Sequence, residues 1–252
     1  MEKQTFILLI FVMCWKRRRG YSEEFLLVNV GGDFSVFSIN AKRFDTCKEI
    51  KMHAIKTNRM SYIDEIERLG GINKMYLPTD TTLNIDEILT IENDIGARLP
   101  DGLRDFLMKY GVSDFDEEVI FEPISIDAQY IHDEDSSQLD FIFEGSSIGV
   151  FYGKDPEEEG AYDIFWNIEN YKDRMPSQFL PFATDGMGNQ IVMSLKKENY
   201  GLIYFWDHEA EWDAEDYYDE TGAVMPEEVK YQNLWLLANN FDDFFARLHV
   251  EV

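Results

Sequence analysis

Charge changes abruptly at residue 60 of this chain. Residues 1–59 hold 11 Lys and Arg against 6 Asp and Glu, a net charge of +5, whereas residues 60–252 have a net charge of −31. Such a break is typical of two segments with different origins or roles. We therefore expect a basic N-terminal extension, 1–59, followed by an acidic domain, 60–252, that is large enough to bury one hydrophobic core.

The acidic excess also restricts the binding partners. A net charge of −26 for the whole chain repels phosphate backbones and anionic lipid, so neither nucleic acid nor a membrane surface is expected as a partner. The 19 Phe, 13 Tyr and 5 Trp distinguish the chain from a disordered acidic one. Both cysteines, Cys14 and Cys47, lie in the basic extension. The acidic domain therefore lacks a disulfide framework, which favours a reducing, cytoplasmic location.

The extension begins with an apolar run, Thr5 to Trp15, of 11 residues. This is shorter than the roughly 18 needed to span a bilayer. It has the length of a signal-peptide core, but the basic cluster Lys16–Arg19 follows it and does not precede it, so a buried strand is the simpler interpretation and secretion the alternative. Apolar segments on either side of Gly31 and Gly32 predict a β-hairpin. A further hypothesis is that translation normally begins at Met60, which mass spectrometry of the native N-terminus would test.

Helices are predicted near both ends of the acidic domain. One begins at the N-cap Asn84, with Glu87 at the capping-box position, and ends at Gly96. A second helix, closed by Gly111, carries the amphipathic stripe Leu103, Phe106, Leu107 and Tyr110. A last helix carries the stripe Phe241, Phe244, Phe245 and Leu248, and Asn240 is its expected cap.

Strand signals occupy the middle of the domain, separated by Gly, Pro and acidic turns. The predicted strands are 119–124, 139–144, 147–153, 162–166, 189–195 and 201–207. The polar turn KKENY joins the last two. Helices on both sides of a run of strands predict an α+β fold with a mostly antiparallel sheet.

Five segments of the acidic domain, in order along the chain, resemble the SMI1/KNR4 (SUKH) family. They are IENDIGARLPDGLRDFLMKYG (91–111), IGVFYG (148–153), MPSQFLPFATDGMGNQIVMSL (175–195), IYFWDHE (203–209) and NNFDDFFARL (239–248). Two departures are that residues 1–59 have no counterpart and that a single glycine, Gly111, stands where the family often has a pair. The resemblance implies a SUKH-like α+β fold, with N-terminal and C-terminal helices flanking the sheet, and it implies neither catalysis nor a cofactor. For bacterial members it implies an immunity protein that binds and neutralises a toxin; a regulatory scaffold, as in fungal relatives, is the alternative.

One motif suggests nucleophilic catalysis. Gly145-Ser146-Ser147-Ile148-Gly149 matches the G-x-S-x-G nucleophile elbow, whose chemistry requires a helix directly after the serine. Here a strand is predicted instead, so a turn is favoured over a hydrolase site. No catalytic residue is therefore assigned.

No metal site is predicted either. Acidic and hydroxyl residues do fall at calcium-loop spacing, at Asp133, Asp135, Ser137 and Glu144, but Gln138 stands where the loop requires glycine. The histidines, His53, His132, His208 and His249, are scattered without a zinc-binding spacing. His208 is interpreted as a surface histidine at the end of a strand, not as a catalytic base. The segment 185–189 (DGMGN) predicts a tight connection, because it lacks the length of a phosphate-binding loop.

The acidic stretch 207–220 is the candidate partner-binding site. Carboxylates there are interleaved with aromatic residues, and the candidates are Asp207, Glu209, Glu211, Trp212, Asp213, Glu215, Asp216, Tyr217 and Tyr218. A solvated loop is the simpler interpretation. As a binding site, the carboxylates would steer a basic partner while the aromatic residues anchor it, and a nuclease toxin would be such a partner. A weaker candidate is the cluster Asp155, Glu157, Glu158 and Glu159.

Overall fold

The computed structural model describes residues 10–14, 24–30, 33–39, 61–124, 145–157, 160–209 and 211–251, the first three ranges by their backbone alone. Contacts divide the chain into two compact units, Met1–Arg59 and Met60–Val252. Within the described residues, no helix is long and apolar enough to cross a membrane. The predicted strand 139–144, the calcium-loop candidates at 133–144, and His53 and His132 lie outside these residues.

The first unit contains an antiparallel sheet in the order β1 (Ile10–Cys14), β2 (Glu24–Val30) and β3 (Asp33–Ile39). Strands β2 and β3 pair antiparallel up to Val30 and Asp33. The predicted hairpin is confirmed, as is a strand within the apolar run.

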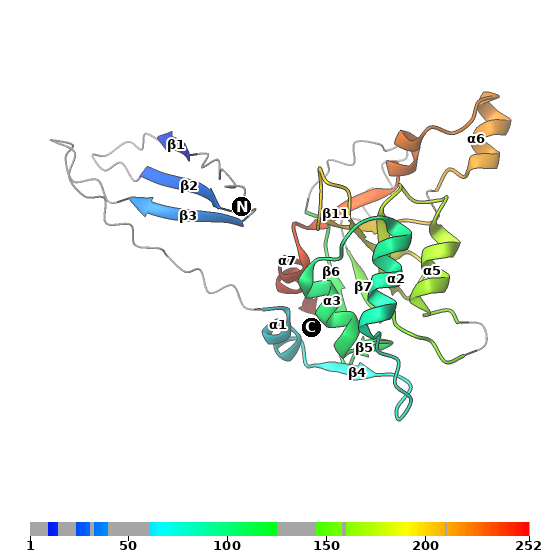
Figure 1. Ribbon diagram of the computed structural model, residues 1–252, viewed down its shortest axis with the longest axis horizontal. Helices are drawn as coiled ribbons and strands as arrows, with labels where there is room; N and C mark the ends of the chain where they lie inside the picture. Colours follow the sequence, from blue (N-terminus) through cyan, green and yellow to red (C-terminus); the bar gives the residue numbers. More distant parts are fainter. Residues whose placement is uncertain are drawn as a thin grey trace, which may run out of the picture. The chain divides into compact units, whose positions relative to one another are not determined.

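The second unit is built on a sheet whose described strands pair antiparallel (Figure 1). Its main path runs in the order β11 (Leu234–Ala238), β10 (Ile203–Trp206), β9 (Gln190–Ser194), β8 (Phe179–Asp185), β7 (Ser146–Phe151), β5 (Ser113–Phe115) and β4 (Ile72–Lys74). The short strands β6 (Val119–Phe121) and β12 (His249–Val250) pair with each other, and β6 also pairs with β7.

Helices precede, interrupt and follow the run of strands. They are α1 (Tyr62–Arg68), α2 (Ile85–Ile95), α3 (Asp101–Lys109), α5 (Ile164–Tyr171), α6 (Ala214–Thr221), the 3-10 helix η1 (Glu227–Tyr231) and α7 (Phe241–Arg247). The α+β fold with a mostly antiparallel sheet is thus confirmed.

The helix boundaries follow from capping. The Asn84 side chain accepts hydrogen bonds from the backbone N–H groups of Asp86 and Glu87, and the Glu87 carboxylate accepts one from the Asn84 N–H at 2.7 Å. Gly96 then ends α2 with a φ of 75°. Asn240 caps α7 through the N–H of Asp243. Each predicted cap is confirmed.

Two hydrophobic cores form on opposite faces of the sheet. Because side chains alternate along a strand, Ile191 and Met193 of β9 join the larger core, and Val192 joins the smaller one. The larger core packs against α1, α2, α3 and α7. The smaller one contains Trp206 and is covered by Met175 and neighbouring residues.

Several elements differ from the sequence prediction, and three of them are described here. The segment 162–166, predicted as a strand, begins helix α5, because Asp163 accepts hydrogen bonds from the N–H groups of Phe165 and Trp166 and so caps a helix. The acidic stretch is only partly a loop, since residues Ala214–Thr221 form α6. Strand β8, which was not predicted, pairs with β7 and β9.

Removing the cap of α2 should destabilise the domain. Asn84→Ala deletes the acceptor for two helix N–H groups, and we expect the free energy of unfolding in urea to fall by about 1 kcal/mol. The exposed Asn93 on the same helix provides the matched control, and Asn93→Ala should change it by no more than about 0.5 kcal/mol. Equal effects of the two substitutions would contradict the role of the cap.

Candidate protein-binding surfaces

The acidic stretch forms an arm that projects from the sheet domain (Figure 1). We define the α6 arm as residues 212–226, of which 213 caps and 214–221 form the helix. The Asp213 carboxylate accepts hydrogen bonds from the N–H groups of Glu215 at 2.7 Å and Asp216 at 2.9 Å. Gly222, with a φ of 70°, ends the helix. No residue of α6 is buried, so the helix contributes nothing to either core.

Both ends of the α6 arm are attached to the same segment of the domain. Before the arm, the Glu211 carboxylate accepts hydrogen bonds from Nε of Arg174 at 3.0 Å. Arg174 also stacks over the rings of Tyr171 and Trp206, at 4.9 and 5.3 Å from their centroids. After the arm, Glu227 accepts a hydrogen bond from the N–H of Ser177 at 2.6 Å. The arm is therefore mostly exposed but fixed at its base.

The predicted site residues are divided between the base and the surface of the arm. Glu211 forms an ion pair with Arg174 inside the domain, and only 9% of its side chain is exposed. Asp207 accepts a hydrogen bond from the Glu209 N–H. The rings of Trp212 and Tyr217 lie 4.8 Å apart and are half-buried. The exposed candidates are Glu209, Asp213, Glu215, Asp216 and Tyr218.

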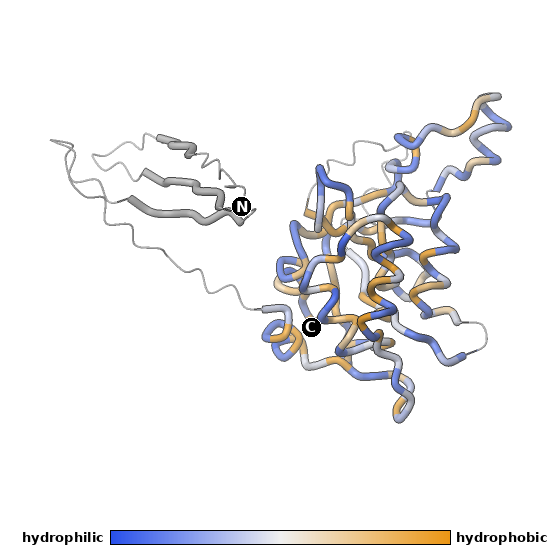
Figure 2. Tube along the Cα trace, in the orientation of Figure 1, coloured by the Kyte–Doolittle hydropathy of each residue, from blue (hydrophilic) through white to orange (hydrophobic). Residues whose placement is uncertain are grey.

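The tip of the α6 arm also exposes apolar surface. Val224 is 86% and Tyr218 57% exposed. Figure 2 shows a mostly hydrophilic arm with a short hydrophobic stretch at its tip. Val224 was not predicted as a site residue, because the prediction followed charge and stopped at residue 220.

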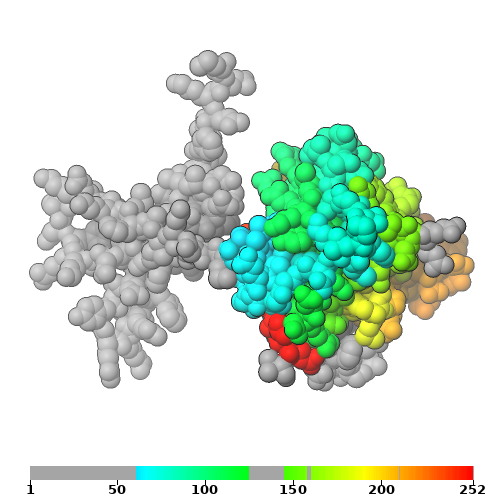
Figure 3. Space-filling view, turned by 90° about the horizontal axis from the view of Figure 1, so that it is seen from below, coloured from blue at the N-terminus to red at the C-terminus, as the bar shows by residue number. Residues whose placement is uncertain are grey.

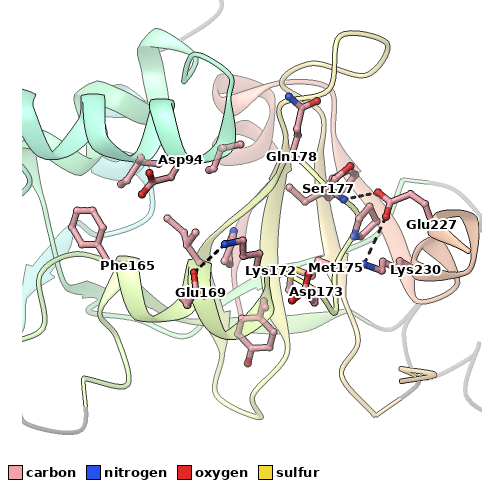
Figure 4. A pocket seen from close by; sticks show the side chains of 17 residues that line it. Asp94, Phe165, Glu169, Lys172, Asp173, Met175, Ser177, Gln178, Glu227 and Lys230 are labelled. Atoms are coloured by element: carbon pink, nitrogen blue, oxygen red, sulfur yellow. Dashed lines mark hydrogen bonds and ion pairs between the residues drawn. The ribbon is translucent and has the colours of Figure 1, made fainter. Parts of the chain in front are cut away.

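A groove lies beside the base of the arm, between α2, α5, the segment 175–181 and η1 (Figure 4). Its volume is about 750 Å³. The apolar side chains that line it include Ile95, Phe165, Ile168, Met175 and Phe179. No local sequence pattern predicts this groove, since its walls come from four elements separated along the chain.

The rim of the groove is charged. Lys172 pairs with Glu169 at 3.5 Å, and Lys230 with Glu227 at 3.7 Å, as the dashed lines in Figure 4 show. Burial alone would raise the pKa of Glu227, but hydrogen bonds from Ser177 and Lys196 bring it below its ordinary value of 4.5. Glu227 therefore remains ionised. Its carboxylate, at the end of the arm, contacts Ser177, Lys196 and the rim residue Lys230.

The residues that could suggest catalysis have structural roles in the described part of the chain. Ser147 lies within strand β7 and pairs with Ile120, so no helix follows it. Gly149 allows close approach to β8, since a Cβ there would lie 2.9 Å from the Gly186 nitrogen. His208 contacts the side-chain oxygen of Asn189 through Nδ1 at 2.7 Å.

The other candidate loops also have structural roles. Asp185 accepts hydrogen bonds from the N–H groups of Met187 and Asn189, and Gly188 has a φ of 97°, which confirms a tight β8–β9 connection. Asp155 accepts from the N–H groups of Glu157 and Tyr162, so it shapes its own loop. Glu158 and Glu159 lie outside the described residues. Among the described residues, no three His, Cys, Asp or Glu side chains are grouped to hold a metal ion.

Comparison with known proteins identifies the family. The fold is an α+β domain with an antiparallel sheet between helices, as the sequence predicted. Its surface carries an exposed arm and a groove. The SMI1 / KNR4 family (SUKH-1) matches residues 82–247, and the chain belongs to this family. One relative is the SPbeta prophage-derived uncharacterized protein YokK of Bacillus subtilis (strain 168), which is 27% identical over 172 residues, 65% of this chain and 73% of YokK. No solved structure matches.

The pairing of Glu227 should make stability depend on pH. Because the pKa of Glu227 is lower in the folded protein, its pairing stabilises the fold above about pH 5 and this contribution is lost as the pH falls through the folded pKa. Glu227→Gln should therefore lower the free energy of unfolding at pH 7 and by progressively less toward pH 3, measured in urea.

The neighbouring Glu228 provides the control. Its carboxylate is exposed and makes no hydrogen bond or ion pair within the described residues. If Glu228→Gln alters the pH dependence as much as Glu227→Gln, the pairing at Glu227 is not its source.

Proposed function

We propose that this protein is a non-catalytic immunity protein that acts in the cytoplasm by binding and neutralising a basic toxin domain. Family membership supports a binding role, because the SMI1/KNR4 resemblance implies immunity for bacterial members. The acidic surface supports the sign of the partner's charge. A nuclease, which must be basic to hold nucleic acid, has the required charge.

The α6 arm is the single observation that carries this proposal. A helix that buries no side chain contributes little to folding, yet its ends are held by Arg174 and Ser177. Fixing a helix in this way lowers the entropy lost when it binds a partner. The arm therefore has the properties of a preorganised contact surface.

Charge and apolar surface would have different roles in the complex. The exposed carboxylates of the arm would accelerate association with a basic partner, to rates of about 10⁸ M⁻¹s⁻¹ at low salt. Tyr218 and Val224 would supply apolar contact area, and aromatic residues are frequent anchors in protein interfaces.

Co-expression tests the function directly. The partner to use is the small basic C-terminal domain of a large secreted protein encoded beside this chain's gene. Cells that express that domain should survive only when the full chain is also present, and the purified proteins should form a complex that salt weakens. Survival without complex formation, or weak binding to several unrelated proteins, would favour a regulatory scaffold instead.

Charge reversal on the arm should slow association with the toxin domain. In the triple variant Glu215→Lys, Asp216→Lys and Asp219→Lys, the cap Asp213 is kept so that α6 still has its N-terminal acceptor. We expect the association rate with the toxin domain to fall by about 10-fold to 100-fold at low salt, because rim charges act mainly on association. Stopped-flow fluorescence measures this rate.

A control triple tests whether position matters. Glu67, Glu117 and Glu118 are exposed, and Glu117 lies beside Gly70 just after α1. Helix α1 and the α6 arm lie on opposite sides of this unit in both Figure 1 and Figure 3. Reversing these three charges changes the net charge by the same amount as the α6 triple. It should slow association with the toxin domain much less than that triple does. Equal slowing by both triples would mean that association responds to the net charge and not to the arm.

Protection should not depend on the two residues that could suggest catalysis. Ser147→Ala and His208→Gln should each protect cells as well as the unaltered chain, because the proposal assigns neither a chemical step. Toxin activity measured with a molar excess of each variant provides the quantitative comparison. Loss of protection by a variant that folds and binds the toxin normally would indicate an enzyme.

A further inference from the structure

We propose that the groove between α2, α5 and η1 binds an extended, cationic segment of a partner protein. This inference extends the proposed function by adding a second contact beside the α6 arm. It rests on that function only for the identity of the partner. The groove, its rim and the backbone at its mouth each support it separately.

The floor of the groove suits an apolar side chain. Its volume of about 750 Å³ is within the range of ligand-binding clefts. Ile95, Phe165 and Ile168 are only partly buried, although they pack against the larger core. In the described lining, no buried side-chain polar atom lacks a hydrogen-bond partner. A small polar ligand would therefore find little to orient it, whereas an aliphatic or aromatic side chain would cover apolar surface.

The rim favours positive charge. Its two lysines, Lys172 and Lys230, are already paired with Glu169 and Glu227. The remaining rim carboxylates, Asp94 and Asp173, are exposed and have no ion pair within the described residues. A Lys or Arg on either side of the inserted apolar residue would lie near these carboxylates.

The backbone at the mouth of the groove is strained. Gln178 has a φ of 61°, the only positive φ among the described non-glycine residues. Hydrogen bonds on both sides maintain it, from the Ser177 N–H to Glu227 at 2.6 Å and from the Leu195 N–H to the Gln178 carbonyl at 2.8 Å. Such conformations cluster at ligand-binding sites, where the rest of the fold offsets their cost.

The strained conformation presents the Gln178 side chain at the groove. Gln178 is one of the residues that line the groove, and Figure 4 shows its amide at the edge of this lining. It offers both a donor and an acceptor, which is what the backbone of an extended peptide requires. A glycine would adopt this φ without strain, so the presence of glutamine points to a role for the side chain.

A defined peptide tests the groove without any toxin. The probe is the acetylated and amidated peptide GKFLKG, and its matched control is GEFLEG. Methyl-labelled full-length protein is titrated with each, and the NMR signals of Ile95, Ile168 and Met175 are followed. We expect these signals to shift with the cationic peptide, with a dissociation constant of about 1 mM or tighter, and not with the acidic one.

Two variants locate the charge effect. Asp94→Lys combined with Asp173→Lys should weaken binding of the cationic peptide at least about 10-fold. Glu67→Lys combined with Glu118→Lys makes the same change of net charge far from the groove and should weaken it much less. Equal weakening would mean that the peptide responds to overall charge, and it would overturn the inference.

Substitution at Gln178 separates binding from stability. Gln178→Gly should raise the melting temperature by about 2 °C, because the backbone strain is relieved. It should also raise the dissociation constant of the cationic peptide by about 3-fold to 10-fold, because the amide is lost. Gln178→Asn, which keeps an amide and tolerates positive φ, should bind more tightly than the glycine variant. An unchanged affinity of Gln178→Gly for the peptide would show that the Gln178 amide takes no part in binding.

The peptide and protection experiments fail independently. If the NMR signals of the groove residues do not shift with the cationic peptide while the chain still neutralises the toxin domain, the groove inference is wrong and the proposed function stands. If the peptide binds but no toxin is neutralised, the groove remains a peptide site and the proposed function is wrong.

Discussion

The packing around Phe106 holds the two ends of the acidic domain together. Its ring lies 4.8 Å from that of Phe151 on β7, and 5.6 to 6.0 Å from those of Tyr62 on α1 and Phe241 on α7. Hydrogen bonds support the same contact, since Arg68 donates to the carbonyls of Phe245 and Leu248. Because α1 and α7 come from opposite ends of the domain, these contacts link local helices to the sheet.

The fold also uses part of its negative charge internally. Glu92 accepts hydrogen bonds from the Leu99 N–H at 2.9 Å and from Arg104 at 2.8 Å. Asp163 and Asp213 cap helices, where a carboxylate interacts favourably with the helix dipole. Such carboxylates stabilise the domain and have less freedom to bind a partner. The acids on the outer surface of α6 have no such role, which is why the arm is the better candidate for a contact surface than the total charge would suggest.

The sequence predicted best where local signals agree. The caps at Asn84 and Asn240 and the glycine stop at Gly96 are short-range features, and all three were confirmed. Strand β8 was not predicted. It contains Pro181, a residue type that is rare in central strands, and the register of β8 with β9 shifts between Pro181 and Ala183. Residues 162–166 were misassigned because a short apolar run fits either element.

The candidate binding surfaces were only partly predictable, for similar reasons. Asp213 and Gly222 do mark the ends of α6, but the intervening acids place like charges four residues apart, which disfavours a helix. Tertiary contacts at the base offset this cost, and the Arg174–Glu211 pair is not visible in the sequence because its partners are separated by 37 residues. The groove likewise depends on four separate elements. The conformation of Gln178 depends on hydrogen bonds to residues 195 and 227, so no local pattern reveals it.

The segment 174–178 contacts both the arm and the groove. Arg174 pairs with Glu211 at one end of the arm, Ser177 donates a hydrogen bond to Glu227 at the other end, and Gln178, the next residue along the chain, lines the groove. A partner that occupied the groove would restrict this segment and so further fix the base of the arm. By thermodynamic linkage, binding of a partner to the arm would then make binding at the groove more favourable by the same free energy. One continuous basic protein could therefore bind both surfaces with more affinity than either alone, provided that its geometry allows simultaneous contact.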